Sequence, residues 1–416
     1  MSSLTGGMDY YKLTMGEVAH ALHTYQSARF AFTYRGKENL PARIPLAQLQ
    51  ERLAADRERQ VPAHILQALH AERLSNGKPT FHSSYLDFLS RDFRLPEVSA
   101  EVVHDDARGE RFEIVANGAW PHVSPWETIM MGAVNELYIA AEMNRLGLSD
   151  EDLDRKGEKR LREKIAILKQ HPDITFADFG TRRRRSFAWQ RRVLEIVANE
   201  LPDQLIGTSN VDLAFELGLR PIGTMAHEMD MAYEGIYYHN NHSTGQLVSH
   251  QIMLDDWWEA YGKDLSIALT DTYTSEFFFR TFGEERAKLW RGLRHDSGNP
   301  IAFGERAIRF YRDFDIDPRE KIIIFSDGLD VPSMVKIANH FRDRINFAFG
   351  WGTNLMNDCG IKPISIVMKL VLLGSVYTVK LPDNLAKVTG PERRVRETAR
   401  WAGVNLGSVG SQTCTY

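Results

Sequence analysis

The chain has 416 residues, of which 43% are hydrophobic and 25% charged, and its formal net charge is −4. This composition is ordinary for a globular enzyme, and the small net charge argues against nucleic acid and acidic membranes as partners. Its two cysteines, Cys359 and Cys414, suggest no disulfide framework. No apolar run approaches the ~18 residues of a membrane span, and the N-terminus lacks the features of a signal peptide. We therefore expect a cytoplasmic protein.

The first part of the chain, residues 1–150, predicts an α+β domain. The alternating stretch ARFAFTYRG is typical of a strand, LAQLQERLAAD and PAHILQALHAERL of helices, and RFEIVANGAWPHVSP of a hairpin. A charged amphipathic helix, DEDLDRKGEKRLREKIAILKQ, follows and joins this domain to the next.

From about Asp173 a repeating order of short apolar run, polar or Gly-containing motif and helical stretch appears about seven times. The runs end in the motifs DITFADFG, DQLIGTS, RPIGTMAH, LSIALTDTYT, GLRHDSGNP, KIIIFSDGLD and INFAFGWGTN. Alternating strands and helices predict parallel pairing. We expect an irregular βα-barrel of about seven strands over residues 151–390, with a peripheral tail over 391–416. The motifs should converge, because loops after barrel strands share one face.

Several of these motifs contain residues suited to anions. Arg294 and Asp296 follow one strand, where a guanidinium suits a carboxylate or phosphate and an aspartate suits hydroxyls or Mg²⁺; a purely structural Arg–Asp pair is the alternative. Turns that open helices offer free N–H groups to phosphate, although any βα turn uses Gly and Asp. The phosphate candidates are Asp327, Gly328, Gly350, Gly352 and Thr353.

The stretch FGTRRRRS places four arginines, residues 182–185, at the start of a helix. Basic residues there oppose the helix dipole, so we expect at least one to face an anion, and Phe179 could stack on a flat ring. Asp271 is a further candidate for an ion or hydroxyl. His239 and His242 lack companions at zinc-ligand spacing and are expected to be ordinary loop histidines.

His227, in GTMAHE, has three interpretations: a structural histidine, a general base, or a nucleophile toward phosphorus. Its position at a predicted strand end, among presumed phosphate loops, favours the last two, and the residues alone do not rank them.

Taken together, the motifs resemble the nicotinate phosphoribosyltransferase family. The resemblance covers roughly residues 8–390 and is carried by DYYKLTM, FGTRRRRS, GTSN, GTMAHE, LTDTYT, RHDSG, FSDG and FGWGTN, in that order. It implies a type II phosphoribosyltransferase fold and the ATP-coupled reaction of nicotinate with phosphoribosyl pyrophosphate, which gives nicotinate mononucleotide and pyrophosphate for NAD salvage.

The resemblance also implies roles for individual residues. His227 matches a transiently phosphorylated histidine, with Arg294 and Asp296 completing the catalytic group, and Tyr11 matches a tyrosine that stacks on nicotinate from the neighbouring subunit of a homodimer. The implied nicotinate contacts are Tyr11, Phe179, Arg182, Ser209, Thr224 and Arg294. Phosphoribosyl pyrophosphate would contact Asp271, Asp327, Gly328, Gly350, Gly352 and Thr353, and Mg²⁺ would be held by Asp296 and Asp327.

Ser209 bears on substrate choice. The related nicotinamide enzymes place an aspartate at this position, which accepts from an amide but repels a carboxylate, whereas a serine can donate to the acid. The alternatives are a nicotinamide or quinolinate phosphoribosyltransferase, or a metabolite-sensing protein of the same fold. A sugar-phosphate aldolase or isomerase would need a lysine or glutamate at a strand end, and Lys380 is the nearest candidate.

Overall fold

The computed structural model describes residues 3–105, 109–238 and 245–406, so His239, His242 and Cys414 lie outside the described residues. The chain forms two compact units. The first comprises residues 1–223 and 351–369, and the second comprises 224–350 and 370–416. This division differs from the predicted boundaries at 150 and 390, because the chain passes between the units three times and neither unit is one continuous segment.

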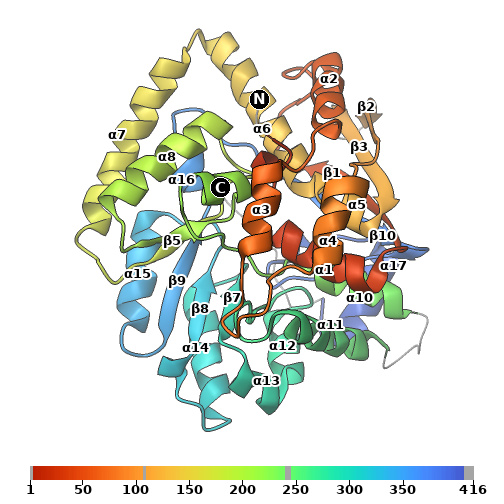
Figure 1. The fold of residues 1–416 in the computed structure, drawn as a ribbon, viewed down its shortest axis with the longest axis vertical. Helices are drawn as coiled ribbons and strands as arrows, with labels where there is room; N and C mark the ends of the chain where they lie inside the picture. Colours follow the sequence, from red (N-terminus) through yellow and green to blue (C-terminus); the bar gives the residue numbers. More distant parts are fainter. Residues whose placement is uncertain (1–2, 106–108, 239–244, 407–416) are drawn as a thin grey trace. The chain divides into compact units, whose positions relative to one another are not determined.

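The first unit contains an antiparallel sheet, a set of helices and two parallel strands (Figure 1). Its elements are η1 (Thr5–Gly7), α1 (Tyr11–His23), β1 (Ser27–Tyr34), α2 (Leu46–Arg57), α3 (Ala63–Ala71), α4 (Ser83–Asp87), the π-helical turn η2 (Phe88–Asp92), β2 (Val98–Asp105), β3 (Gly109–Ala119), α5 (Trp120–Val123), α6 (Trp126–Leu146), α7 (Asp150–Leu168), β4 (Phe176–Asp178), α8 (Phe187–Glu200), β5 (Leu205–Thr208), α9 (Val211–Glu216) and, after the second unit begins and returns, α16 (Thr353–Met356).

Strand β3 lies between β1 and β2 and pairs antiparallel with both. Along β1, Ala28, Phe30 and Phe32 are buried and alternate with more exposed residues, which is the period expected of a strand with one face on a core. The predicted strand and helices of this region are therefore present. The stretch RFEIVANGAWPHVSP is not a hairpin by itself: it forms the second strand, β3, of the β2–β3 hairpin and then turns into helix α5.

The second unit contains α10 (His227–Tyr237), α11 (Gly245–Tyr261), β6 (Ile267–Leu269), α12 (Ser275–Thr281), α13 (Gly283–Leu289), β7 (Gly292–His295), α14 (Pro300–Arg312), η4 (Pro318–Glu320), β8 (Ile322–Phe325), α15 (Val331–Phe341), β11 (Val376–Tyr377), η5 (Leu385–Lys387) and α17 (Glu392–Ala402). Two further strands, β9 (Asn346–Trp351) and β10 (Ile366–Leu373), extend across the sequence boundaries of the units.

Strands β6 to β9 pair parallel in chain order, and helices separate them in sequence. Three of the helices begin with a side-chain cap, since Thr274, Asn299 and Asp330 accept hydrogen bonds from backbone N–H groups of α12, α14 and α15. Such caps satisfy donors that have no partner within the helix. The parallel sheet with helical connections confirms the predicted α/β class.

The segment RPI does not form the strand predicted for it. Pro221 makes only an isolated parallel bridge to Thr208, and Ile222 donates to the Thr208 carbonyl at 2.9 Å. Proline lacks an N–H group for a ladder, and Gly223 ends the extended run, so the pairing does not propagate. His227 therefore follows a loop instead of a strand.

The described part of the tail beyond residue 390 contains a helix, α17, although its sequence pattern is weak. Helix α17 buries Ala399 against Val379 and Leu381, and Ala402 against Tyr273 and Phe277. Its described part thus belongs to the core of the second unit.

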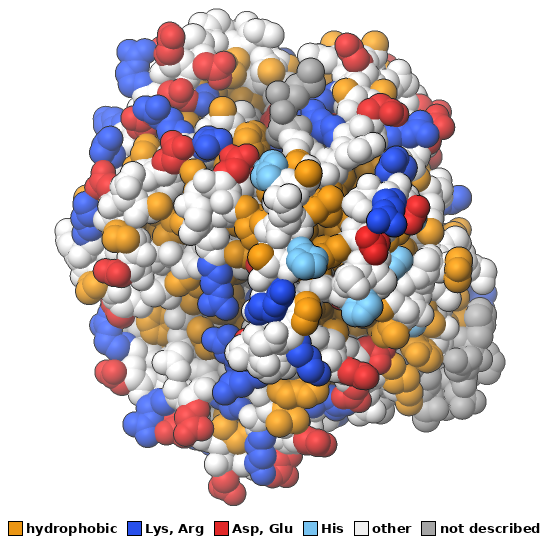
Figure 2. Space-filling model, in the orientation of Figure 1, with side chains coloured by type: hydrophobic (Ala, Val, Ile, Leu, Met, Phe, Trp, Pro, Cys, Tyr) orange, Lys and Arg blue, Asp and Glu red, His pale blue; other side chains and the backbone are white. Residues whose placement is uncertain are grey.

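No described helix combines the length and apolarity needed to cross a bilayer. On the face drawn in Figure 2, acidic and basic side chains are interspersed around the periphery. This distribution agrees with the mixed charge of the sequence.

Candidate active site

In the second unit, the loops that follow β6, β7 and β8 carry polar residues that contact one another. Ser297 Oγ, after β7, donates to Asp271 Oδ2, after β6, at 2.5 Å. Ser326 Oγ, after β8, donates to Asp296 Oδ1 at 3.1 Å. The carboxyl ends of neighbouring parallel strands meet at one edge, so residues distant in sequence form one cluster.

His227 is the first residue of α10 and lies in this cluster, with 4% of its surface exposed. Its Nδ1 is 3.1 Å from Thr272 Oγ1, and its Nε2 is 3.0 Å from Asp296 Oδ2 and 3.8 Å from Asp271 Oδ1. Lys380 Nζ lies 2.8 Å from the same Nε2. The imidazole is therefore held at both nitrogens by groups from three other segments.

Burial, followed by the Lys380 charge, lowers the pKa of His227 to about 4, although Asp271 and Asp296 oppose this shift. Burial alone would raise the pKa of Asp296, but the hydrogen bond with His227 and the Arg294 charge hold it well below its ordinary range. At neutral pH the cluster thus contains a neutral imidazole beside an ionised carboxylate, which is the state of a nucleophile or base.

Arg294 lies on β7 and close to the His227 segment, since its Nη1 donates to the Met225 carbonyl at 3.1 Å. Its Nε is buried and has no hydrogen-bond partner among the described residues. A buried donor without a partner is costly, so this atom is suited to an anionic ligand. Thr224 lies next to β6, where its hydroxyl donates to the Ile267 carbonyl at 3.4 Å.

Asp327, predicted as a phosphate and metal residue, is engaged by a lysine. Lys387 Nζ donates to both of its carboxylate oxygens, at 2.7 and 2.8 Å. Gly328 follows with φ of 56°, a left-handed conformation that a side chain would strain. Sequence reasoning missed Thr272 and Lys387, and considered Lys380 only for a different chemistry. The signal for both lysines was weak, since they come after short irregular segments and not after strands of the parallel sheet.

In the first unit, Glu127 is the centre of a second buried cluster. It forms ion pairs with Lys12 at 2.7 Å, Lys369 at 3.0 Å and Arg182 at 3.4 Å, and the Tyr11 hydroxyl donates to it at 3.3 Å. Burial would raise the pKa of Glu127, but the three cations hold it well below its ordinary range. The cations outnumber the carboxylates in contact with them, and this excess positive charge favours an anion.

Ser209 and Asp9 belong to the same region of the first unit. The Ser209 hydroxyl donates to Asp9 Oδ1 at 2.6 Å, and Arg182 Nε lies 3.2 Å from Asp9 Oδ2. Burial raises the pKa of Asp9 although Arg182 opposes the shift. The serine proton is thus directed at a protein carboxylate, so the structure does not show it free for a ligand's acid group.

The four arginines of the run separate into different roles. Arg182 pairs with the two carboxylates just described. Arg183 donates to the Ile366 carbonyl at 2.8 Å, while buried Arg184 pairs with Glu136 at 3.0 Å and Arg185 pairs with Asp154. At least one arginine therefore faces an anion, as expected, and the anions seen are protein carboxylates.

The remaining predicted residues of the first unit lie around Phe179, whose N–H donates to the Trp351 carbonyl at 2.9 Å. A side chain at Gly352 would approach the Phe179 carbonyl to 3.1 Å, and Thr353 opens the four-residue helix α16. A side chain at Gly223 would come within 2.7 Å of the Tyr11 nitrogen, so this glycine permits a close backbone approach. Gly350 belongs to the second unit, where it is buried within β9.

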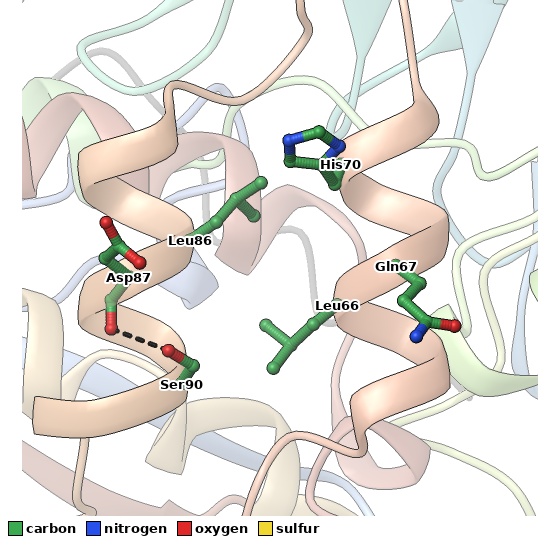
Figure 3. Close-up of a pocket in the computed structure, with 6 residues that line it drawn as sticks. All are labelled: Leu66, Gln67, His70, Leu86, Asp87 and Ser90. Carbon is green, nitrogen blue, oxygen red and sulfur yellow. Dashed lines mark hydrogen bonds between the residues drawn. The ribbon is translucent and has the colours of Figure 1, made fainter.

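A hollow of about 490 Å³ lies elsewhere in the first unit, between α3 and the α4–η2 segment (Figure 3). Leu66 and Leu86 project into it, and Ser90 donates to the Asp87 carbonyl at 2.9 Å on its rim. None of the predicted site residues lines it. It is therefore separate from the two clusters described above.

A buried His–carboxylate–lysine cluster at the strand ends of an α/β fold is typical of the active site of an enzyme. Comparison with known proteins gives the family. Residues 7–135 match the nicotinate phosphoribosyltransferase N-terminal domain, and residues 174–400 match the nicotinate phosphoribosyltransferase family. The chain belongs to the nicotinate phosphoribosyltransferase family.

Individual relatives agree with this assignment. A nicotinate phosphoribosyltransferase of Chromohalobacter salexigens is 37% identical over 362 residues, which cover 87% of each chain. One of Herminiimonas arsenicoxydans is 37% identical over 390 residues, covering 91% of this chain and 92% of that one. A crystal structure of the Porphyromonas gingivalis enzyme superposes with a TM-score of 0.85 at 32% identity, over 97% of this chain and all (100%) of that chain.

Proposed function

We propose that this protein transfers the phosphoribosyl group of phosphoribosyl pyrophosphate to nicotinate in NAD salvage, in the cytoplasm, and couples the transfer to ATP through phosphorylation of His227. The observation that carries the proposal is the environment of His227. Its neutral, buried imidazole lies between Asp296 and Lys380, with Thr272 at the other nitrogen. This arrangement suits a nucleophile toward phosphorus better than a structural histidine.

The position of His227 at the start of α10 supports the same role. The helix has 11 residues and begins at His227, so the positive end of its dipole lies at this residue. A phosphoryl group on His227 would be stabilised there, and the unpartnered Nε of Arg294 adds a donor in the same unit. The negative charge of phosphohistidine could then change the affinity for phosphoribosyl pyrophosphate.

Nicotinate would be bound by Phe179 and Tyr11 against its ring and by Arg182 near its carboxylate, with Ser209, Thr224 and Arg294 as further contacts. The excess of cations around Glu127 supports an acid over an amide. The Ser209 hydroxyl donates its hydrogen bond to Asp9. For Ser209 to contribute to acid selectivity, this hydrogen bond must be shared with the nicotinate carboxylate or transferred to it.

Phosphoribosyl pyrophosphate would contact Asp271 and the glycine-containing turns, that is, Asp327, Gly328, Gly350, Gly352 and Thr353. For Mg²⁺ the donor set fits in part. Asp271 Oδ1 is buried without a hydrogen-bond partner among the described residues, and its ligand atom lies within 4.8 Å of those of Asp296 and His227. Carboxylate oxygens suit Mg²⁺, so Asp296, with Asp271, would hold the ion, while Asp327 would first have to release Lys387. The bound ion would neutralise charge on the leaving pyrophosphate.

The chemistry at the sugar needs no protein nucleophile. As pyrophosphate leaves, the ribose C1 becomes oxocarbenium-like and the pyridine nitrogen attacks it, so orientation and charge stabilisation are what the residues supply. The cationic residues and the ring contacts proposed above serve these two purposes.

A homodimer with shared active sites completes the proposal, with Tyr11 acting in the neighbouring subunit. In the single chain Tyr11 is only 7% exposed and Arg182 lies over its ring, with Cζ 5.5 Å from the ring centroid. The support for this role is therefore the DYYKLTM motif.

The phosphorylation is tested with γ-³²P-ATP. We expect His227→Ala to abolish labelling while some ATP-independent transfer remains, because the ribosyl chemistry does not pass through the imidazole. His250 provides a matched control: it is buried in the same unit and its Nδ1 is 2.6 Å from Asp230. His250→Asn should label like the wild type, and undiminished labelling of His227→Ala would show that another residue is phosphorylated.

A further inference from the structure

The Nε2 atom of His227 faces two groups of opposite charge, and a single nitrogen cannot satisfy both. Asp296 Oδ2, at 3.0 Å, requires a proton on Nε2, whereas the Lys380 ammonium, at 2.8 Å, requires the lone pair. The nucleophilic form is the second one, with the ring proton on Nδ1 facing Thr272. Which partner prevails therefore decides whether the imidazole can attack phosphorus.

The backbone fixes Lys380 beside the histidine. Lys380 pairs with Thr389 through two hydrogen bonds, Lys380 N–H to Thr389 O at 3.1 Å and Thr389 N–H to Lys380 O at 3.0 Å. The next residue, Leu381, donates to the carbonyl of Thr272 at 2.8 Å. The residue that carries the ammonium and the residue that contacts Nδ1 are thus joined through adjacent backbone atoms.

Lys380 is only 5% exposed, which is unusual for a lysine, because its charge is costly to bury without compensation. Lys387 makes a useful comparison: it is also buried, and its ammonium is held by both oxygens of Asp327. The ammonium of Lys380 lies 2.8 Å from Nε2 of His227, and its charge also helps to lower the pKa values of Asp271 and Asp296. A cation beside a nucleophilic atom can stabilise the negative charge of a phosphoryl group that becomes attached to that atom.

We propose that Lys380 is a catalytic residue of the phosphoryl transfer to His227, first holding Nε2 as a lone pair and then donating to the oxygens of the phosphoryl group. In this step the Nε2 lone pair forms the N–P bond while the bond from the γ-phosphorus to the bridging oxygen breaks. ADP leaves with that electron pair, and the ring keeps its Nδ1 proton toward Thr272. The inference rests on the proposed phosphorylation of His227.

The test compares Lys380→Met and Lys380→Arg with Lys321→Met as a matched control. Lys321 is 6% exposed and donates to the Lys288 and Trp290 carbonyls, at the amino end of β8, whereas the cluster lies at the carboxyl ends. We expect the initial rate of labelling by γ-³²P-ATP to fall on the order of 10²-fold in Lys380→Met, in line with loss of one preorganised donor. Lys380→Arg should recover part of the rate, and Lys321→Met should label like the wild type even if it is less stable.

A second readout is the tautomer of His227, measured by ¹⁵N NMR of histidine-labelled protein and assigned with His227→Asn. The wild type should carry its proton on Nδ1, and Lys380→Met should move it to Nε2, facing Asp296. Wild-type labelling rates and an unchanged tautomer in Lys380→Met would overturn the inference. If the wild type itself is not labelled, the proposed phosphorylation fails, and the tautomer then decides on its own whether Lys380 controls Nε2. Should Lys380→Met not fold, both measurements are made on Lys380→Arg. Its labelling rate should still lie below that of the wild type, because its planar guanidinium moves the donor away from Nε2.

Discussion

At the scale of single residues, the protein holds an imidazole neutral in its interior. His227 has a pKa lowered from 6.5 to about 4, first by burial and then by Lys380. A neutral imidazole keeps a lone pair at physiological pH, which phosphorus chemistry needs. The same shift has a consequence for stability, because an unfolded chain protonates this histidine more readily than the folded protein does.

The sign of this effect follows from the two pKa values. Between about pH 6.5 and 4 the unfolded state binds the proton and the folded state does not, so stability falls as the pH is lowered through this window. The expected loss from His227 is about 2 kcal/mol at pH 5 relative to pH 8. Urea unfolding gives the free energy of unfolding of the wild type and of His227→Asn at pH 5 and pH 8. The difference between the two proteins should change by this amount between the two pH values. A difference that does not vary with pH would contradict the buried neutral state.

At the scale of elements, α17 holds α10, the helix that begins with His227. Arg394 of α17 forms a salt bridge with the fully buried Glu234 of α10. It also donates to the Tyr377 carbonyl at 3.1 Å. Its guanidinium lies 4.2 Å from the centre of the Tyr238 ring. Glu234 and Arg394 are 160 residues apart in the sequence. Helix α17 thus helps to position α10, the helix that begins with His227.

Arg394→Met should destabilise the protein by about 3–5 kcal/mol, because it leaves the Glu234 carboxylate buried without its partner. Arg396→Met is the control on the same helix, since the Arg396–Glu392 pair is exposed and should contribute less than about 0.5 kcal/mol. Thermal and urea unfolding measure both. Equal effects of the two substitutions would show that the buried pair does not fix α17 to α10.

At the scale of the whole molecule, the proposed dimer can be tested by mixing subunits. Tyr11→Ala and His227→Ala each impair ATP-coupled activity if both residues act as proposed. If Tyr11 serves the partner's site, a hybrid dimer has one site with both defects and one with neither. Random pairing of equal amounts should then restore about a quarter of the wild-type activity. Activity of the mixture equal to the mean of the two parents would place Tyr11 in its own subunit's site.

The sequence by itself determined the α/β class, because hydrophobic periodicity and short turn signals are local and survive without knowledge of contacts. The resemblance of its motifs, taken in series, indicated the family. Helices and strands such as β1, α8 and the Asn210-capped α9 follow from such local patterns. The tertiary structure decided what depends on distant pairings. It placed Lys380 on His227, directed the Ser209 hydroxyl to Asp9, reduced the segment RPI to a single bridge and packed α17 into a core. Those outcomes depend on which buried charges and surfaces meet after folding, and the free energy of such contacts is not encoded in any short stretch of the chain.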